Sequence, residues 1–313
     1  MRILFCGTPH FAVPTFIRLL AQPDIEIAAV ITQPDRPRGR GHEISASPVK
    51  EAAIAANVPV HQPEKIRSPE ARDLLQRLAP DCIVIIAYGQ IIPAALLSIP
   101  KLGWINLHAS LLPKYRGAAP INWAVANGET QTGVTTMRID AGMDTGDILL
   151  QEEIDIAPEE TATELAESLA EAGAPRMLET LRGLAAGKLV ARPQNNGEAT
   201  YAPLLKKEDG RIDWNRPAQE IYNRMRGFAP WPGAYTSFRG QSCQLWGEPF
   251  SLRAVNVGAP GTIFLEDGQI LISCGRTTLL RLVYVKLEGR KQVSAEEFAN
   301  GARLTQRERF DNA

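Results

Sequence analysis

The feature that most constrains this chain is the alternation of short apolar segments with helical patterns over its first half. Two Ser-Pro pairs predict helix starts, with serine as the cap and proline at the first helical position. Apolar strands separated by helices indicate βαβ units around a largely parallel sheet, in which ligands bind beyond the carboxyl ends of the strands. The predicted strands are 3–6, 25–32, 58–60, 82–87, 104–108, 132–139 and 148–154, and the predicted helices are 11–21, 48 onward, 69–78 and 162–187.

The second half of the chain has a different pattern. Residues 190–205 show no periodicity and contain Pro, Gly and paired Asn, which is typical of a linker. A helix is predicted over 217–228, and several short β-like runs punctuated by glycine follow it. Such spacing predicts a small closed sheet or barrel.

Charge and cysteine content limit the classes of partner. The net charge is −1, but residues 205–313 carry a balance of +4 and residues 1–204 a balance of −5. This asymmetry indicates either a polyanionic partner for the basic half or two ordinary solvated surfaces. No apolar run approaches the ~20 residues that span a bilayer, so we expect no membrane association. Four scattered cysteines without CxxC spacing predict a reducing cytoplasm, with neither disulfides nor a zinc site.

Two polar side chains stand near the end of the predicted strand 104–108. Asn106 and His108 are two residues apart, so they share one face of the strand. Polar groups are costly in such a place unless they are hydrogen-bonded. The pair indicates either a reactive site or a satisfied core histidine beside an asparagine that caps the next turn.

Two further segments have both a functional and a structural interpretation. Asp144 lies between Gly142 and Gly146, which indicates an unusual backbone at a site or simply an Asp-rich turn. The glutamate that a twelve-residue calcium loop requires is missing. The run 32–42 follows a strand and is predicted to be an exposed loop, which contacts phosphate or RNA or is merely solvated. It contains three arginines, Arg36, Arg38 and Arg40.

Taken together, several runs resemble the methionyl-tRNA formyltransferase family. The resemblance covers nearly the whole chain. The Asn-His and Asp segments are common to folate-dependent N-formyltransferases, whereas the arginine-rich run and the C-terminal motifs narrow the resemblance to enzymes acting on tRNA. The matching runs are GTP (7–9), TQPDRPRGRG (32–41), AYG (87–89), INLHASLLPKYRGAAPI (105–121), MDTGDI (143–148), RIDW (211–214) and RGFAPWP (226–232).

The resemblance implies an α/β architecture: a Rossmann-like formyltransferase domain over 1–189, a linker over 190–205, and an OB-like β-barrel that binds tRNA over 206–313. The implied reaction moves a formyl group from 10-formyltetrahydrofolate to the α-amino group of methionyl initiator tRNA, without a metal. We expect a monomer.

The resemblance also implies roles for individual residues. Asn106 would donate to the oxyanion, His108 would supply a proton or hydrogen bond, and Asp144 would orient His108 and help to remove the proton of the amine. The wall of the folate pocket would be Ser110, Leu111, Leu112 and Pro113. The tRNA contacts would be Arg36, Arg38, Arg40, Lys206, Lys207, Arg290 and Lys291.

Three alternatives remain open from the sequence. A formyltransferase acting on a small amine, such as an amino-sugar nucleotide, would keep the chemistry and change the acceptor. A folate-dependent hydrolase would use water in place of the amine. A non-catalytic OB-type RNA-binding protein would not need the set Asn106, His108 and Asp144. A nucleotide-dependent oxidoreductase is disfavoured because no GxGxxG follows the first strand.

Overall fold

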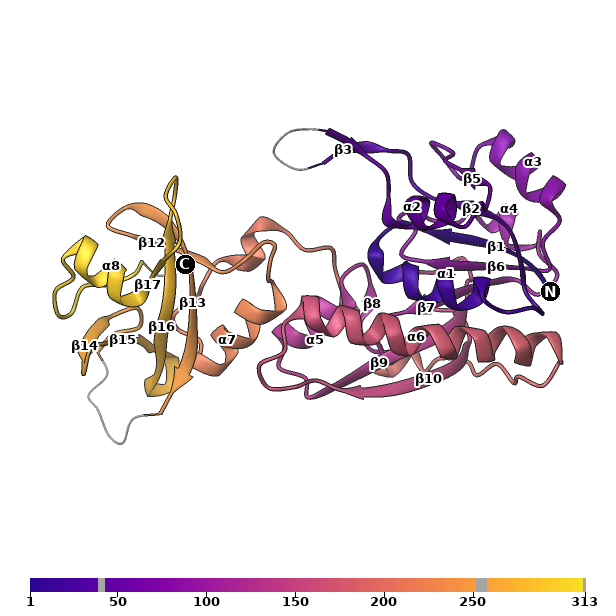
Figure 1. Cartoon of the computed structure of the whole chain (residues 1–313). Coiled ribbons are helices and arrows are strands. Elements are labelled where there is room, and N and C mark those ends of the chain that lie inside the picture. The colour runs from indigo at the N-terminus through magenta and orange to yellow at the C-terminus, as the bar shows by residue number, and fades with distance from the viewer. Residues whose placement is uncertain (39–42, 252–257, 312–313) are drawn as a thin grey trace. The chain divides into compact units, whose positions relative to one another are not determined.

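The computed structural model describes residues 1–38, 43–251 and 258–311, and its contacts group the chain into two units (Figure 1). The first unit comprises Met1–Pro120, Gln131–Asp155 and Glu164–Ala202, and the second comprises Ile121–Thr130, Ile156–Thr163 and Pro203–Ala313. The division into 1–189, 190–205 and 206–313 stays a prediction about which parts fold independently.

The first unit is built on a seven-stranded sheet in the order β10-β9-β7-β6-β1-β2-β5. The five strands from β7 to β5 are parallel, and β9 and β10 add an antiparallel edge. The predicted Rossmann-like, parallel-rich sheet is therefore confirmed. Its strands are β1 (Arg2–Gly7), β2 (Glu26–Ile31), β5 (Val60–His61), β6 (Cys82–Ile86), β7 (Trp104–His108), β9 (Gln131–Arg138) and β10 (Ile148–Asp155).

Helices cover both faces of this sheet because its strands are apolar on both sides. Leu4 and Ile83 pack with Leu75 of α3 on one face, whereas Phe5 meets Phe16 of α1 edge-on at 5.4 Å on the other face. The helices associated with the sheet are η1 (His10–Ala12), α1 (Val13–Leu20), α2 (Pro48–Ala55), α3 (Pro69–Leu78), α4 (Ala94–Leu97) and α6 (Ala162–Ala185). Ser47 and Ser68 cap α2 and α3 with their hydroxyl groups, as the Ser-Pro pairs predict.

The carboxyl ends of three neighbouring strands are joined by one carbonyl group. The strand order reverses between β1 and β6, which is where such sheets place their ligands. The carbonyl oxygen of Tyr88, just after β6, accepts hydrogen bonds from Thr8 Oγ1 (3.1 Å) and Gln33 Nε2 (3.0 Å), which follow β1 and β2. The carboxyl ends of these strands are thus held together by hydrogen bonds at the switch point.

The arginine-rich run is a hairpin rather than the plain loop that the sequence predicts. β3 (Arg36–Arg38) pairs antiparallel with β4 (Glu43–Ser45), and residues 39–42 between them lie outside the described residues. Arg36 precedes a proline, and such residues favour extended backbone. The Pro- and Gly-rich composition concealed this strand preference.

The second unit holds an antiparallel sheet in the order β12-β13-β16-β15-β14, with β17 paired to β16. Its strands are β12 (Tyr235–Phe238), β13 (Gln241–Phe250), β14 (Ile263–Glu266), β15 (Gln269–Cys274), β16 (Thr278–Leu287) and β17 (Val293–Ser294). The other elements are α5 (Pro120–Ala126), which begins in the first unit, and α7 (Ala218–Gly227), α8 (Ala295–Ala302), η3 (Lys207–Gly210) and η4 (Gly275–Thr277). The sequence predicts α7 and the main strands but not α8.

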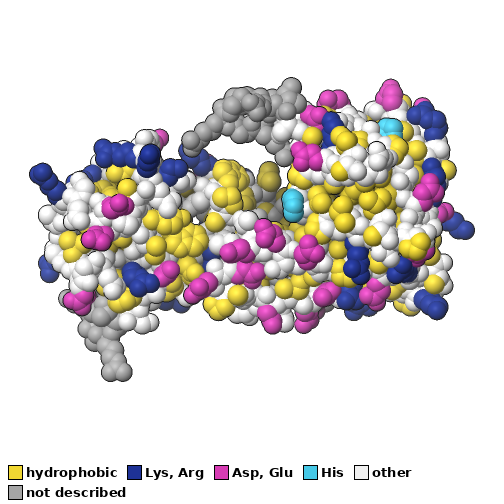
Figure 2. Space-filling model, in the orientation of Figure 1, with side chains coloured by type: hydrophobic (Ala, Val, Ile, Leu, Met, Phe, Trp, Pro, Cys, Tyr) yellow, Lys and Arg dark blue, Asp and Glu magenta, His cyan; other side chains and the backbone are white. Residues whose placement is uncertain are grey.

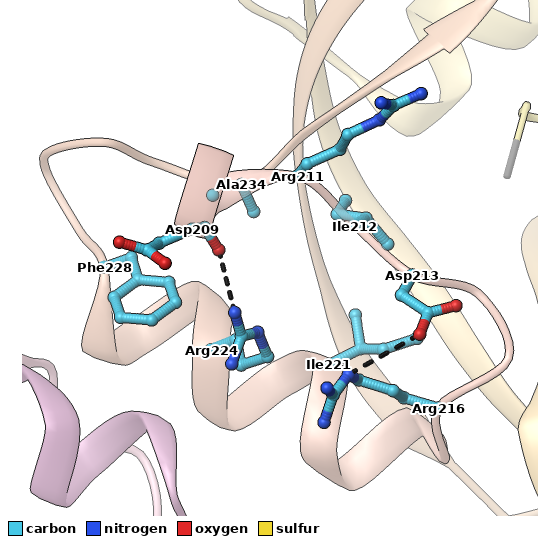
Figure 3. A pocket seen from close by; sticks show the side chains of 10 residues that line it. Asp209, Arg211, Ile212, Asp213, Arg216, Ile221, Arg224, Phe228 and Ala234 are labelled. Carbon is cyan, nitrogen blue, oxygen red and sulfur yellow. Dashed lines mark hydrogen bonds and ion pairs between the residues drawn. The ribbon is translucent and has the colours of Figure 1, made fainter. Parts of the chain in front are cut away.

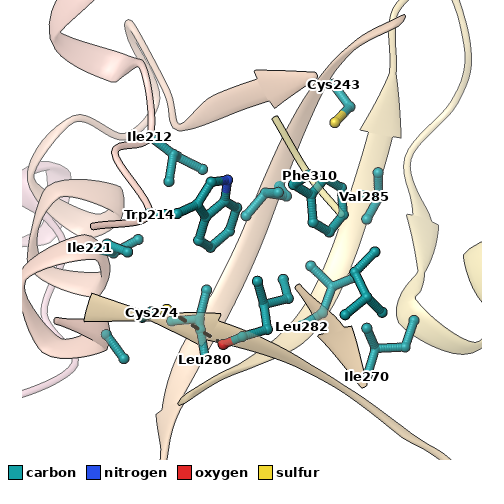
Figure 4. Close-up of a cluster of buried hydrophobic side chains, with 14 of the residues drawn as sticks. Ile212, Trp214, Ile221, Cys243, Ile270, Cys274, Leu280, Leu282, Val285 and Phe310 are labelled. Carbon is teal, nitrogen blue, oxygen red and sulfur yellow. Dashed lines mark hydrogen bonds between the residues drawn. The ribbon is translucent and has the colours of Figure 1, made fainter. Parts of the chain in front are cut away.

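The C-terminal segment spans the gap between the two edge strands of this sheet. Among the described residues no ladder joins β12 to β14. Instead, Asp311 N donates to Ser237 O on β12, and Ile263 N on β14 donates to Glu308 O. Phe310 is fully buried and stacks on Trp214 with ring centroids 5.7 Å apart, so the segment also fills the core (Figure 4).

The four cysteines lie in the interior of the protein. All four cysteines are buried and unpaired, and burial raises the pKa of Cys82, Cys243 and Cys274 to about 12. Within the described ranges, none of the helices is both long and apolar enough to cross a bilayer.

The end of α6 is fastened to the turn before β2 by an ion pair. Arg182 donates from Nε and NH2 to the two oxygens of Asp24, at 2.9 and 2.8 Å. The hydrogen bond from Arg182 holds the pKa of Asp24 at about 2, below the usual 3.8. Because the folded-state pKa is lowered, the stabilisation is complete above about pH 4 and is lost as the pH falls toward 2.

We therefore expect Asp24→Asn to lower the melting temperature at pH 7 and to have a shrinking effect between pH 4 and pH 2. Thermal unfolding of both proteins across this range measures the difference. The control is Asp73→Asn, an exposed carboxylate on α3 for which no ion pair is recorded among the described residues. A deficit of equal size at every pH would show that the ion pair is not its source.

Candidate active site

β7 carries the two polar residues at its carboxyl end, and the packing of Leu107 against α6 determines which face of the sheet they lie on. Leu107 packs onto α6, where a Cβ on Gly173 would lie 2.5 Å from its Cδ2. Side chains alternate along a strand, so Asn106 and His108 point to the opposite face. That is the face on which Trp104 packs, with its Nε1 donating to Leu96 O at 2.9 Å. The strand therefore presents both polar groups together.

The hydrogen-bonding partner of His108 fixes its tautomer. The side chain is only 6% exposed, and its Nε2 lies 2.9 Å from the carbonyl oxygen of Tyr115. A carbonyl can only accept, so the hydrogen must be on Nε2. Nδ1 then remains available, and it lies 3.8 Å from Oδ2 of Asp144. The nitrogen that can exchange a proton in this site is Nδ1.

Asp144 is held in a left-handed conformation with φ +53°. Its Oδ2 accepts a hydrogen bond of 2.9 Å from the backbone N–H of Gly117, in β8 (Arg116–Gly117). The neighbouring Gly146 lies against β9, since a Cβ there would come 1.9 Å from Arg138 O. Backbone contacts on both sides therefore aim the carboxylate at His108.

Asn106 differs from His108 and Asp144 because its side-chain amide N–H groups are free to bind a ligand. It is half-buried, and no hydrogen bond of its side chain is recorded among the described residues. An amide in this position can donate to an oxygen that approaches the open side of β7. Asn106, His108 and Asp144 thus provide two hydrogen-bond donors, one proton acceptor and one negative charge at the end of the sheet.

The segment after β7 forms a fixed wall. Thr135 Oγ1 donates to Ser110 O at 2.6 Å and accepts from Leu112 N at 3.2 Å. Gln151 Nε2 donates to Leu112 O at 2.9 Å. Ser110 and Leu112 are buried, whereas Leu111 and Pro113 are half-buried and can meet a ligand.

Sequence reasoning missed the contribution of residues 194–202, which it assigns to a linker. β11 (Tyr201–Ala202) pairs in parallel with β8, and Thr200 O accepts from Arg116 N at 2.9 Å. Gln194 reaches the loop that carries Asp144. No periodic pattern marks these residues because each contact is made by a single side chain or one backbone group.

The arginine hairpin is anchored at its base. Lys50 donates to the carboxylate of Asp35 and to Gln62 Oε1, and Gln62 Nε2 donates to Asp35 Oδ1 at 2.8 Å. Hydrogen bonds from Lys50 and Gln62 keep the pKa of Asp35 below its usual range. Of the three predicted arginines, Arg36 is exposed at the start of β3, Arg38 ends β3, and Arg40 lies outside the described residues.

Basic and acidic side chains are distributed unevenly over the surface. Figure 2 shows acidic side chains over α6, where Glu164, Glu167 and Glu171 are exposed, and Lys and Arg side chains along one edge of the second unit. The predicted contacts in the second unit are all exposed: Lys206, Lys207, Arg290 and Lys291.

A small cavity in the second unit is structural. It lies beneath η3, has a volume of about 10 Å³, and is lined in part by Arg216 and Arg224 (Figure 3). Arg224 points at the carbonyl of Asp209 and Arg216 at the carboxylate of Asp213. Such a volume holds one water at most. Across the described part of the chain, no group of three or more His, Cys, Asp or Glu residues could hold a metal ion.

Comparisons with known proteins find similarity over nearly the whole chain. Residues 1–181 match the family model described as formyl transferase, and residues 204–303 match the formyl transferase C-terminal domain. A methionyl-tRNA formyltransferase of Solibacter usitatus is 53% identical over 99% of this chain and 98% of its own length. That of Geobacter sulfurreducens is 50% identical, over 97% and 95%. The chain belongs to the methionyl-tRNA formyltransferase family.

Two solved structures share the fold of this member of the methionyl-tRNA formyltransferase family. The sugar 3N-formyl transferase WlaRD, solved with dTDP and 5-N-formyl-THF, matches with a TM-score of 0.64 and 19% identity, covering 93% of this chain and 99% of that one. HypX from Aquifex aeolicus in complex with tetrahydrofolic acid matches with a TM-score of 0.60 and 16% identity, covering 100% of this chain and 51% of that one.

The hydrogen bond from Gly117 to Asp144 predicts that Gly117 does not tolerate a side chain. Gly117 has φ +123°, and a Cβ there would lie 2.6 Å from Ala202 O. We expect Gly117→Ala to separate β8 from β11, to withdraw the donor from Asp144, and to lower formyl transfer by about tenfold or more, as small displacements of catalytic groups do.

Steady-state formyl transfer together with thermal unfolding measures the effect of Gly117→Ala. The matched control is Gly301→Ala on α8, where no atom lies within 4 Å of the added Cβ. This control should keep full activity. Full activity of Gly117→Ala itself would show that the hydrogen bond to Asp144 does not matter.

Proposed function

We propose that this protein transfers the formyl group of 10-formyltetrahydrofolate to the α-amino group of methionyl initiator tRNA. The observation that carries the proposal is the 53% identity to a methionyl-tRNA formyltransferase over 99% of the chain. The arrangement of Asn106, His108 and Asp144 at the end of β7 supplies groups suited to this chemistry.

The reaction begins when the uncharged amine attacks the formyl carbon. The C–N bond that forms pushes the electron pair of the formyl C=O onto oxygen. The side-chain amide of Asn106 donates a hydrogen bond to this developing oxyanion. One such donor is worth about 10²–10³ in rate, because it meets a charge that exists only on the reaction path.

His108 moves the proton. Nδ1 of His108 accepts it from the attacking nitrogen, and the carboxylate of Asp144, 3.8 Å away, stabilises the resulting cation. The same proton passes to N10 of the folate as the carbon–N10 bond breaks. The products are the formamide of the methionyl group and tetrahydrofolate, so atoms and charge balance without a metal.

The folate lies along the carboxyl ends of β6 and β7 in this proposal. Leu111 and Pro113 form one wall, on the frame that Ser110 and Leu112 make with Thr135. The loop after β6 exposes Ile91 almost completely (91%), and this side chain offers a second apolar surface for the pteridine ring.

The tRNA is bound largely through its phosphates. In the first unit the contacts come from Arg36 and Arg38 of the hairpin, together with Arg40, which lies outside the described residues. In the second unit they come from Lys206, Lys207, Arg290 and Lys291. Such contacts position the RNA without reading its sequence, and their strength falls steeply with salt. We propose that the protein acts as a monomer.

The decisive experiment is formyl transfer from 10-formyltetrahydrofolate to methionyl initiator tRNA, with methionyl elongator tRNA in parallel. A strong preference for the initiator establishes the function. Transfer to an amino-sugar nucleotide alone, the acceptor class of the related sugar enzymes, would keep the catalytic residues and replace the acceptor.

Replacing the catalytic residues separates chemistry from binding. We expect Asn106→Ala and His108→Ala each to lower turnover by at least about 10², because each removes a group that acts in the transition state, while the Kd for tRNA stays the same. Single-turnover kinetics and filter binding measure the two quantities. His61→Ala is the histidine control, because β5 is an edge strand separated from β7 by three strands. Turnover close to wild type in either active-site variant would remove that residue from the mechanism.

A further inference from the structure

Behind the loop that carries Asp144 lies a buried cation without a carboxylate partner. Arg116 is only 2% exposed, and no carboxylate lies within 4 Å of it among the described residues. Its guanidinium instead faces neutral amides. Nε and NH2 donate to Gln194 Oε1 at 3.0 and 2.7 Å, and NH2 donates also to Asn196 Oδ1 at 2.9 Å. A buried charge retained in this way requires a reason beyond stability.

The orientation of the Gln194 amide follows from this contact. Arginine nitrogens only donate, so the atom that faces Arg116 must be the oxygen. The amide nitrogen then points away from the guanidinium. It lies 2.8 Å from the carbonyl oxygen of Asp144 and 2.7 Å from that of Gly146. One side chain therefore holds the backbone of the loop at two points, on either side of Thr145.

The loop needs such a brace because its conformation is unfavourable by itself. Asp144 is a non-glycine residue with positive φ, a conformation that persists only where surrounding contacts determine it. Arg116 also strengthens the brace, since a cation bound to an amide oxygen polarises the amide and makes its N–H groups better donors.

We propose that Gln194 is a positioning residue for formyl transfer. Its side chain is held by Arg116, and it in turn holds the backbone of Asp144 in place by hydrogen bonds. This inference rests on the proposed function for its kinetic consequence. Gln194 touches neither substrate in this scheme. It acts by keeping the Asp144 carboxylate beside Nδ1 of His108, where the proton arrives.

The substitution that tests this is Gln194→Glu. Glutamate has the same shape and gives Arg116 a better acceptor, so a role of Gln194 limited to binding Arg116 would be preserved. It loses both N–H donors, however, and places an oxygen against two carbonyl oxygens. We expect turnover to fall about tenfold or more, with the KM for the folate changed less than twofold.

The matched control is Asn195→Asp. It makes the same amide-to-carboxylate change one residue along, in an exposed side chain whose Oδ1 accepts from Gly197 N in either form. The change also removes an amide donor, because Asn195 Nδ2 donates to Glu198 Oε1 at 2.9 Å, away from the Asp144 loop. It should keep wild-type turnover. Equal losses in the two variants would overturn the proposal, because added charge alone would then explain them.

A measurement without substrate separates this inference from the proposed function. The amide N–H of Gly117 donates to Oδ2 of Asp144, so its NMR resonance reports where the carboxylate lies. We expect this resonance to move in Gln194→Glu and to stay in Asn195→Asp, whichever amine the enzyme formylates. An unmoved resonance together with unchanged turnover would overturn the proposal. If Gln194→Glu does not fold, Gln194→Asn, which keeps the amide but is one methylene too short, takes its place in both measurements.

Discussion

A parallel sheet covered by helices on both faces leaves the carboxyl ends of its strands for polar chemistry. Within the strands, side chains on either side must be apolar, and the backbone is satisfied by the neighbouring strands. In the parallel strands, polar side chains are accommodated mainly where the strands end. In this protein the ends of β1, β2 and β6 are tied together through the carbonyl of Tyr88, and β7 ends beside them with Asn106 and His108. The site depends on this edge being fixed.

The proposed mechanism also requires that one particular ring nitrogen of His108 carry the proton. His108 has two ring nitrogens, and the carbonyl of Tyr115 occupies one of them. This bond leaves a single nitrogen facing Asp144, so in the proposed mechanism the proton can move only through Nδ1. Tyr115 and Asp144 both have positive φ, which indicates that the backbone is shaped around these two contacts.

The segment that joins the catalytic elements to the second unit is part of the same construction. Its residues 194–202 make the parallel pair β8–β11 and, through Gln194, brace the Asp144 loop. The sequence predicts a linker over 190–205 because that stretch contains Pro, Gly and paired Asn and shows no periodicity. Its contacts come from single side chains and from strands of two residues, too short to produce a periodic pattern. The sequence does not predict α8 for a different reason: its capping box, Ser294 with Glu297, is a local signal confined to four residues.

The sequence by itself determined the parallel-rich sheet, the small sheet of short strands in the second half, and the position of Asn106 and His108 on one strand face. It could do so because periodicity and caps act over a few neighbouring residues. Only the tertiary structure decided which nitrogen of His108 is available, how Asp144 is aimed, and that Arg116 and Gln194 stand behind it. These depend on hydrogen bonds between residues 7 to 80 positions apart. No local pattern encodes such bonds, because they form only when the sheet has brought the segments together.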